Sequence, residues 1–135
     1  MNRPPAISRA VLRAVVAHAR RERPRECCGV LGGVSAGVRL AWPVKNIAPG
    51  ACSYMLDPIE SARGEREIRN AGLFVVGYYH SHPAGCLAPS EADFMSDLWP
   101  GEGPHWRLIV SPSGRVECYR LPAGRKDRAL LNAAR

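Results

Sequence analysis

The 135-residue sequence has no internal repeat, no low-complexity segment and no long apolar run. A run of about 18 or more apolar residues marks a membrane-spanning helix, so we expect no membrane span and no membrane partner. The first ten residues, MNRPPAISRA, also lack the apolar stretch of a signal peptide. This predicts a cytoplasmic protein. Because 46% of the residues are hydrophobic, the chain can bury one core, and its length indicates one domain.

Cysteine spacing excludes two further classes of protein. The count is odd, one pair is adjacent, and no C-x-x-C motif occurs; the residues are Cys27, Cys28, Cys52, Cys86 and Cys118. This pattern argues against a disulfide framework and against a four-cysteine structural zinc site. We expect free thiols, most of them behaving as small buried hydrophobic residues, while a reactive role for one of them stays open.

The net charge of +7 is concentrated near the two ends of the sequence. Residues 1–25 carry a net charge of +6 and residues 120–135 a net charge of +4, whereas residues 26–119 carry −3. No aromatic residues alternate with the basic ones in those end segments, as a nucleic-acid stacking surface would require. We therefore favour solvated helix faces and tails over nucleic-acid binding, and an acidic protein partner is a third possibility.

Hydrophobic periodicity predicts a mixed α/β fold, with about three helices flanking a central mixed β-sheet. Ser8 is a good N-cap for the first helix, and Asp57-Pro58 marks the start of the second. The apolar run before His80 predicts a central strand that is buried on both faces. The expected helices span residues 7–21, 57–70 and 90–98, and the expected strands span 27–34, 38–45, 73–79, 106–110 and 116–121. Residues 1–122 form the predicted domain, followed by a basic tail at 123–135.

The segment HSHPAGCLAPSEAD, residues 80–93, carries the strongest chemical signal. His80 and His82 directly follow the apolar strand, and side chains at i and i+2 of an extended chain point the same way. Both imidazoles can therefore reach one metal ion. Together with Asp93 they would supply three zinc ligands and leave a fourth position open, as in catalytic zinc sites.

Each residue of this pattern also has an ordinary structural explanation. Ser90-x-x-Asp93 resembles a capping box at a helix start, and a lone His-x-His pair is weak evidence for a metal. The capping and ligand roles are compatible. His18 is expected on the polar side of the first helix, and nothing in the spacing of His105 requires it to reach the site. Glu26, at the entry to a buried strand, is either a strand-edge carboxylate or the proton acceptor that a zinc hydrolase needs.

Taken together, Glu26-Cys-Cys-Gly-Val-Leu-Gly-Gly, HSHP and PSEAD resemble the JAMM (MPN-plus) metalloprotease family. The resemblance extends over about residues 7–121 and includes Tyr54-Met-Leu-Asp-Pro58, Trp99 and the closing LIVS…ECYRL hairpin. It implies a JAMM-type, cytidine-deaminase-like domain. The sequence looks most like compact bacterial members that act on ubiquitin-like sulfur-carrier proteins.

The resemblance also implies a role for each residue of the motif. His80, His82 and Asp93 match the zinc ligands, Glu26 matches the general acid/base, and Ser90 matches the serine that stabilises the oxyanion. The implied activity is hydrolysis of the amide bond after the C-terminal Gly-Gly of a ubiquitin-like or sulfur-carrier adduct. The implied cofactor is one Zn²⁺ per chain with water as fourth ligand, and the implied partner is a β-grasp protein.

Two other kinds of zinc protein compete with this hypothesis. One is a non-catalytic, zinc-stabilised module that binds a β-grasp partner, although such a scaffold would need neither Glu26 nor Ser90. The other is a zinc nucleoside deaminase, which we set aside because its H-x-E…P-C-x-x-C signature is missing. The sequence leaves open the oligomeric state and whether the adduct is a cysteine, a lysine-linked protein or a peptide.

Overall fold

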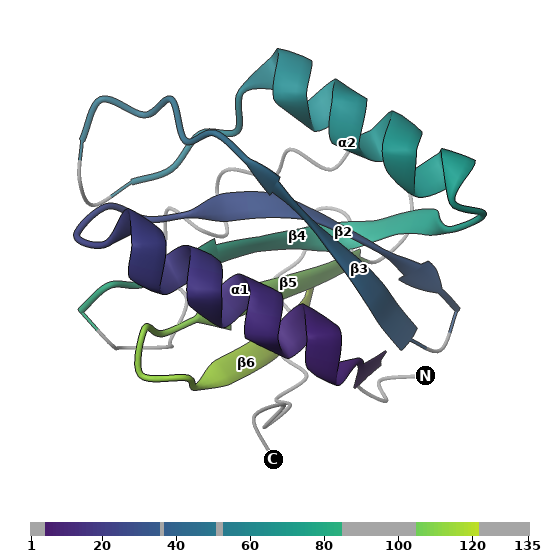
Figure 1. Ribbon diagram of the computed structural model, residues 1–135, viewed down its shortest axis with the longest axis horizontal. Coiled ribbons are helices and arrows are strands. Elements are labelled where there is room, and N and C mark those ends of the chain that lie inside the picture. Colours follow the sequence, from purple (N-terminus) through teal and green to yellow (C-terminus); the bar gives the residue numbers. More distant parts are fainter. Residues whose placement is uncertain (1–4, 36, 51–52, 85–104, 122–135) are drawn as a thin grey trace.

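Two helices and six strands make up the residues that a computed structural model describes, which are 5–35, 37–50, 53–84 and 105–121. In chain order the elements are β1 (Ala6–Ile7), α1 (Arg9–Glu22), β2 (Cys28–Val34), β3 (Gly37–Val44), α2 (Pro58–Asn70), β4 (Phe74–Ser81), β5 (His105–Val110) and β6 (Val116–Leu121). Figure 1 shows these strands side by side in one twisted sheet.

The strands form one six-stranded mixed sheet in the order β1-β3-β2-β4-β5-β6. Strand β2 pairs with β3 and β4 in antiparallel fashion, whereas β4 and β5 run parallel and β5 and β6 form an antiparallel hairpin. Strand β4 therefore lies in the middle of the sheet. The predicted mixed α/β architecture is confirmed.

Local sequence signals fix where both helices begin. The side chain of Ser8 accepts a hydrogen bond from the backbone N–H of Val11 at 3.2 Å, and Asp57 caps α2 by accepting from the N–H of Ile59 at 2.9 Å. Both bonds satisfy backbone donors that the first turn of a helix leaves without a helical partner. The two helix starts agree with the sequence prediction.

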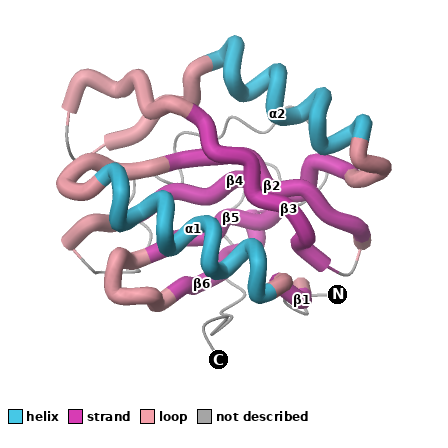
Figure 2. Tube along the Cα trace, in the orientation of Figure 1, coloured by secondary structure: helices cyan, strands magenta, loops and turns pink. Residues whose placement is uncertain are grey.

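The two helices cover opposite faces of the sheet (Figure 2), as the alternation of side chains along β2 makes clear. Cys27 and Leu31 belong to the core cluster that contains Val15 of α1. Cys28 and Val30 point to the other face, in the cluster that contains Ile68 of α2. We call these the α1 face and the α2 face. Neither described helix has the length and apolar character of a membrane span.

Two features of the strands differ from the expectation, and one predicted helix is not tested. Strand β1 was not predicted, because two residues carry no periodic signal; its Ile7, expected at the start of a helix, pairs with Val38 instead. Strand β4 is buried only over its last residues, and Phe74 is 70% exposed. The predicted helix at 90–98 lies outside the described residues.

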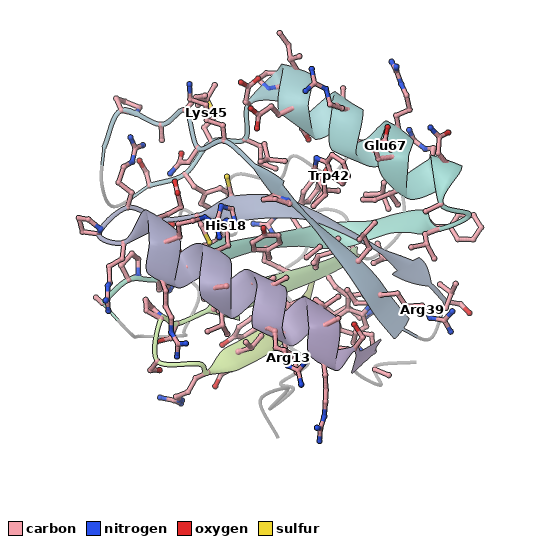
Figure 3. All side chains as sticks on the ribbon, in the orientation of Figure 1. Arg13, His18, Arg39, Trp42, Lys45 and Glu67 are labelled. Carbon is pink, nitrogen blue, oxygen red and sulfur yellow. The ribbon has the colours of Figure 1, made fainter. Side chains whose placement is uncertain are left out.

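His18 is the clearest correction. It does not lie on the polar side of α1 but is buried, because it follows Val11 and Val15 at the spacing of one helix face (Figure 3). Its Nδ1 lies 2.7 Å from the hydroxyl oxygen of Tyr79, so the ring has a hydrogen-bond partner within the core. Burial, followed by the charge of Arg21, lowers the pKa of His18 below its ordinary value of 6.5, and Glu22 partly opposes this.

This buried imidazole makes folding stability depend on pH. Below about pH 6.5 the unfolded chain binds a proton that folded His18 resists, so stability is lost as the pH falls toward the folded-state pKa. We expect the unfolding free energy of the parent to drop more than that of His18→Gln between about pH 7.5 and about pH 5. Urea titrations with a chelator in both samples would measure this, and parallel pH profiles for the two proteins would contradict it.

Candidate metal centre

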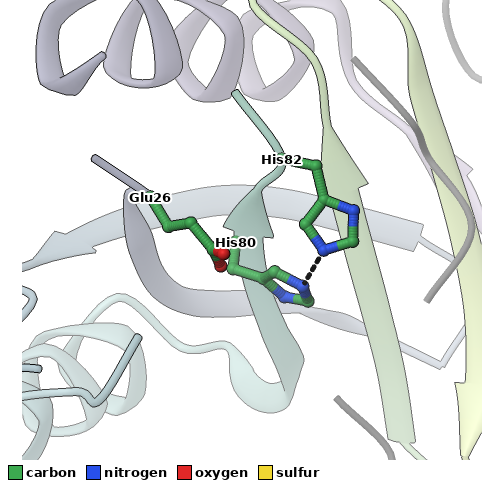
Figure 4. A group of neighbouring side chains, drawn as sticks. All are labelled: Glu26, His80 and His82. Atoms are coloured by element: carbon green, nitrogen blue, oxygen red, sulfur yellow. Dashed lines mark hydrogen bonds between the residues drawn. The ribbon is translucent and has the colours of Figure 1, made fainter. Parts of the chain in front are cut away.

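Glu26, His80 and His82 bring their side chains together at one end of the sheet (Figure 4). His80 lies near the end of β4 and His82 directly follows the strand. Cys28 of β2 pairs with His80, so the antiparallel register carries Glu26, two residues before Cys28, toward His82. One nitrogen of each imidazole and one carboxylate oxygen all lie within 4.8 Å of one another.

The distances and the chemistry of these donors fit a zinc ion. The Nε2 atoms of His80 and His82 are 3.2 Å apart. Two nitrogens bound at 2.0–2.1 Å to a tetrahedral zinc would be separated by about 3.3 Å. Imidazole and carboxylate are both common zinc ligands, and the predicted i, i+2 geometry of the two histidines is confirmed as a spatial juxtaposition.

Burial differs among the three side chains. His80 is fully buried and Glu26 is 7% exposed, whereas His82 is half-buried. A charged carboxylate that close to the core needs polar neighbours to offset its desolvation. The arrangement thus places an acid and two imidazoles in a poorly hydrated position that still reaches the surface at His82.

The backbone around the two histidines is held on both sides. The backbone N–H of Cys27 donates to the Ser81 hydroxyl at 2.7 Å, and the N–H of Ser81 donates to the carbonyl of Cys27 at 3.0 Å. On the other side, the N–H of His82 donates to the carbonyl of Val110 in β5 at 3.0 Å. This fixes the chain between His80 and His82, which favours a preorganised site.

Asn46 ties the neighbouring loop to Glu26. Its Nδ2 donates to the backbone carbonyls of Glu26 and Ser53 at 2.9 and 3.1 Å, while its Oδ1 accepts from the N–H groups of Ala48 and Met55 at 2.9 and 3.0 Å. One side chain therefore satisfies four backbone groups and connects the end of β3, the loop after it and the residue that carries the carboxylate.

The remaining motif residues stand as follows. Ser90 and Asp93 lie outside the described residues, so their predicted roles stay predictions. His105 is not in the group: it is level with Val76 in the parallel β4–β5 register, about 13 Å along the strand from His80. This agrees with the expectation that its spacing does not require a place in the site.

The described cysteines are unsuited to nucleophilic catalysis. Cys27, Cys28 and Cys118 are buried free thiols. Burial raises the pKa of Cys27 to about 11 and that of Cys28 to about 12, and it raises the pKa of Cys118 further. Thiols with such values are protonated at neutral pH, and the thiolate is the reactive form. Among the described residues, the groups at this end of the sheet that could take part in metal chemistry are therefore Glu26, His80 and His82.

The sequence interpretation assigned no role at the site to three residues around it: Asn46, Arg107 and Tyr54, the last of which it quoted only as part of the family resemblance. Tyr54 stacks on His80, and Arg107 hydrogen-bonds to Tyr54. A signal existed for Arg107, because a charged residue inside the apolar strand Trp106–Val110 needs a reason, as Glu26 does. Asn46 lies in a loop, where a polar residue carries no such signal, and the resemblance that included Tyr54 implied no contact with His80.

The chain belongs to the JAB family. The model of prokaryotic homologs of the JAB domain, Prok-JAB, matches residues 8–122. The fold, the site geometry and this match agree with the resemblance inferred from the sequence motifs.

Three relatives with assigned names are a desampylase, a probable conjugate-cleaving protease and a cysteine peptidase. The desampylase of Haloferax volcanii is 39% identical over 113 residues, covering 78% of this chain and 79% of that protein. A probable TtuB-protein conjugate cleaving protease of Thermus thermophilus is 28% identical, covering 89% and 78%. The CysO-cysteine peptidase of Mycobacterium tuberculosis is 38% identical over 85 residues, covering 62% and 58%.

Solved structures agree with the architecture. A Desulfitobacterium hafniense protein whose structure was determined in solution superposes with a TM-score of 0.76 at 25% identity, covering 90% of this chain and 87% of that one. The likeness thus extends over the whole mixed sheet and its helices rather than over the motif alone.

Asn46 offers a direct test of how the loop is held. We expect Asn46→Ala to lower the free energy of unfolding by about 2 kcal/mol, because four backbone groups lose a partner and some regain water. Asn46→Asp keeps the two accepted hydrogen bonds and should fall between parent and alanine variant. The exposed Asn70 at the end of α2 supplies the control, and Asn70→Ala should change stability by less than about 0.5 kcal/mol. Equal effects of Asn46→Ala and Asn70→Ala in urea titrations would contradict the assignment.

Proposed function

We propose that this chain is a zinc-dependent peptidase or isopeptidase that cleaves the amide bond after the C-terminal Gly-Gly of a ubiquitin-like or sulfur-carrier protein adduct. The observation that carries the proposal is the convergence of Glu26 with His80 and His82 in a chain of the JAB family. The names of its relatives support the substrate class, since they describe cleavage of protein conjugates and of a carrier–cysteine adduct.

In this proposal His80, His82 and Asp93 would hold one zinc ion and would leave one position open for water. Bound zinc supplies a Lewis acid that polarises the scissile carbonyl and lowers the pKa of water. Glu26 accepts the proton of the water that attacks the carbonyl carbon, and it then delivers this proton to the nitrogen of the leaving amine. The C–O bond forms first and places negative charge on the carbonyl oxygen; the C–N bond then breaks as the carbonyl is restored, and the amine leaves with the proton from Glu26.

Two features of the described residues support Glu26 as that acid/base. Its carboxylate lies within 4.8 Å of both imidazoles, which is near enough to reach the reacting atoms. The backbone of Glu26 is also restrained, because Nδ2 of Asn46 donates a hydrogen bond to its carbonyl. Ser90 is assigned the role of donating a hydrogen bond to the developing oxyanion, a contribution whose loss costs about 10²–10³ in rate.

The partner we propose is a β-grasp protein with a Gly-Gly terminus, because a tail without side chains fits a narrow groove in an extended conformation, by strand addition. We expect the reaction to take place in the cytoplasm. A non-catalytic module that binds the same partner is the competing function, and the first test below separates the two.

Replacing Glu26 should separate catalysis from metal binding. We expect Glu26→Gln to retain stoichiometric zinc and to lose about 10²–10⁴ in kcat, because general acid–base catalysis contributes on that order. His82→Ala should lose both zinc and hydrolysis. Glu67→Gln, on the exposed side of α2, is the matched control and should keep both. Zinc content measured by mass spectrometry and turnover of a carrier–cysteine adduct are the readouts.

Either of two results would overturn this assignment: loss of zinc from Glu26→Gln, or parental turnover in that variant. Removal of zinc with a chelator should abolish turnover, and added Zn²⁺ should restore it. A parent that holds zinc yet cleaves no adduct would favour the non-catalytic module.

The substrate tail can be tested separately. We expect cleavage directly after Gly-Gly and a fall in kcat/KM of about 10²-fold or more when the last glycine is replaced by leucine, because a bulky side chain has no room in a narrow groove. Intact-mass measurements on cysteine-linked and lysine-linked adducts would show which leaving group is preferred. Equal cleavage of glycine- and leucine-terminated adducts would contradict the proposed tail recognition.

A further inference from the structure

The ring of Tyr54 lies flat against the imidazole of His80. The two ring centroids are 4.3 Å apart and the planes differ by only 16°. Tyr54 comes from the segment that leads into α2, whereas His80 comes from β4, so the stack joins two distant parts of the chain. A ring packed face to face at this distance opposes rotation of the imidazole about its Cβ–Cγ bond, which is otherwise a soft torsion.

Tyr54 is in turn held by Arg107 of β5. The guanidinium Nη1 donates a hydrogen bond to the Tyr54 hydroxyl at 2.6 Å. Arg107 pairs with Tyr78 in the parallel β4–β5 register, so it lies on the α2 face, two residues deeper in the sheet than His80. Arg107 thus contacts Tyr54, and Tyr54 contacts the face of the His80 imidazole.

Arg107 is a buried charged side chain, and its position in the core needs an explanation. Only 2% of its surface is exposed, and its neighbours in β5 are apolar. Desolvating a guanidinium costs free energy that an aliphatic residue at this position would not incur. Arginine differs from lysine in presenting a rigid planar group, which suits it to fixing the direction of a partner.

We propose that Arg107 and Tyr54 are positioning residues for His80. Arg107 fixes the ring of Tyr54, and the ring of Tyr54 fixes the imidazole plane so that Nε2 points toward His82 and Glu26. This inference rests on the proposed function in assigning His80 to zinc. Partners of this kind raise metal affinity because they remove the freedom that the ligand would lose on binding.

Zinc affinity, measured by competition with a chromogenic chelator, tests the proposal without any assay of hydrolysis. We expect Tyr54→Leu, which removes both the stack and the hydroxyl, to weaken zinc binding by about 10–100-fold. Tyr54→Phe keeps the stack and should weaken binding less. The control is Tyr119→Phe: Tyr119 is more deeply buried than Tyr54, but its hydroxyl donates to Glu117, and that variant should bind zinc as the parent does.

A double-mutant cycle tests whether Arg107 acts through Tyr54. If it does, Arg107→Gln should weaken zinc binding in the parent but change it little in the Tyr54→Phe background. Cobalt substitution adds a spectroscopic readout, because a freely turning His80 should alter the visible absorption bands of bound Co²⁺ in Tyr54→Leu and not in Tyr119→Phe. If Arg107→Gln fails to fold, Tyr54→Phe still tests the contact, because it removes the hydroxyl that Arg107 binds and keeps the ring.

Several outcomes would overturn the inference. Equal zinc affinity and an identical cobalt spectrum in parent and Tyr54→Leu, with only a lower unfolding free energy, would assign Tyr54 a purely structural role. Additive effects in the cycle would show that Arg107 does not act through Tyr54. A parent that binds no zinc would overturn the proposed function as well, whereas a parent that binds zinc as tightly as Tyr54→Leu would overturn this inference alone.

Discussion

The antiparallel register between β2 and β4 is the constraint on which the site depends. Cys28 pairs with His80, and that single alignment brings Glu26 to the two histidines from more than fifty residues away. A shift of one residue would turn His80 to the α1 face, because side chains alternate along a strand. The register is fixed by burial on both faces of β2, where Cys28 and Val30 pack beneath α2 while Leu31 packs beneath α1.

Close backbone packing supports this register. A Cβ atom at Gly29 would lie 2.2 Å from Cε1 of Tyr79, and one at Gly77 would lie 1.8 Å from the carbonyl oxygen of Trp106. Neither position tolerates a side chain unless the strands move apart. Glycine at these two places therefore lets β2 and β5 lie close to β4.

The sequence predicts those features of the fold and site that depend on local chemistry, and it does not predict contacts between distant segments. The capped helix starts at Ser8 and Asp57 depend on local chemistry, and the alignment of His80 with His82 depends only on strand geometry. The prediction for His18 is wrong because the residue type indicates an exposed position, whereas its spacing from Val11 and Val15 puts it on the buried face. Asn46, Tyr54 and Arg107 meet the site only through the pairing of distant segments, which one sequence does not reveal.

Side chains along β4 point alternately to the two faces of the sheet, and this lets a polar site lie next to a well-packed core. Tyr79 points to the α1 face and bonds to His18, while Tyr78 and His80 point to the α2 face. The last residues of β4 are thus fixed from both faces: by a buried hydrogen bond on one and by the Tyr54 stack on the other. This support from both faces adds to the backbone hydrogen bonds of Ser81 and His82, which hold the strand end to β2 and β5. The His18–Tyr79 pair on one face of β4 and the Tyr54–His80 pair on the other therefore both restrain side chains at the end of the strand.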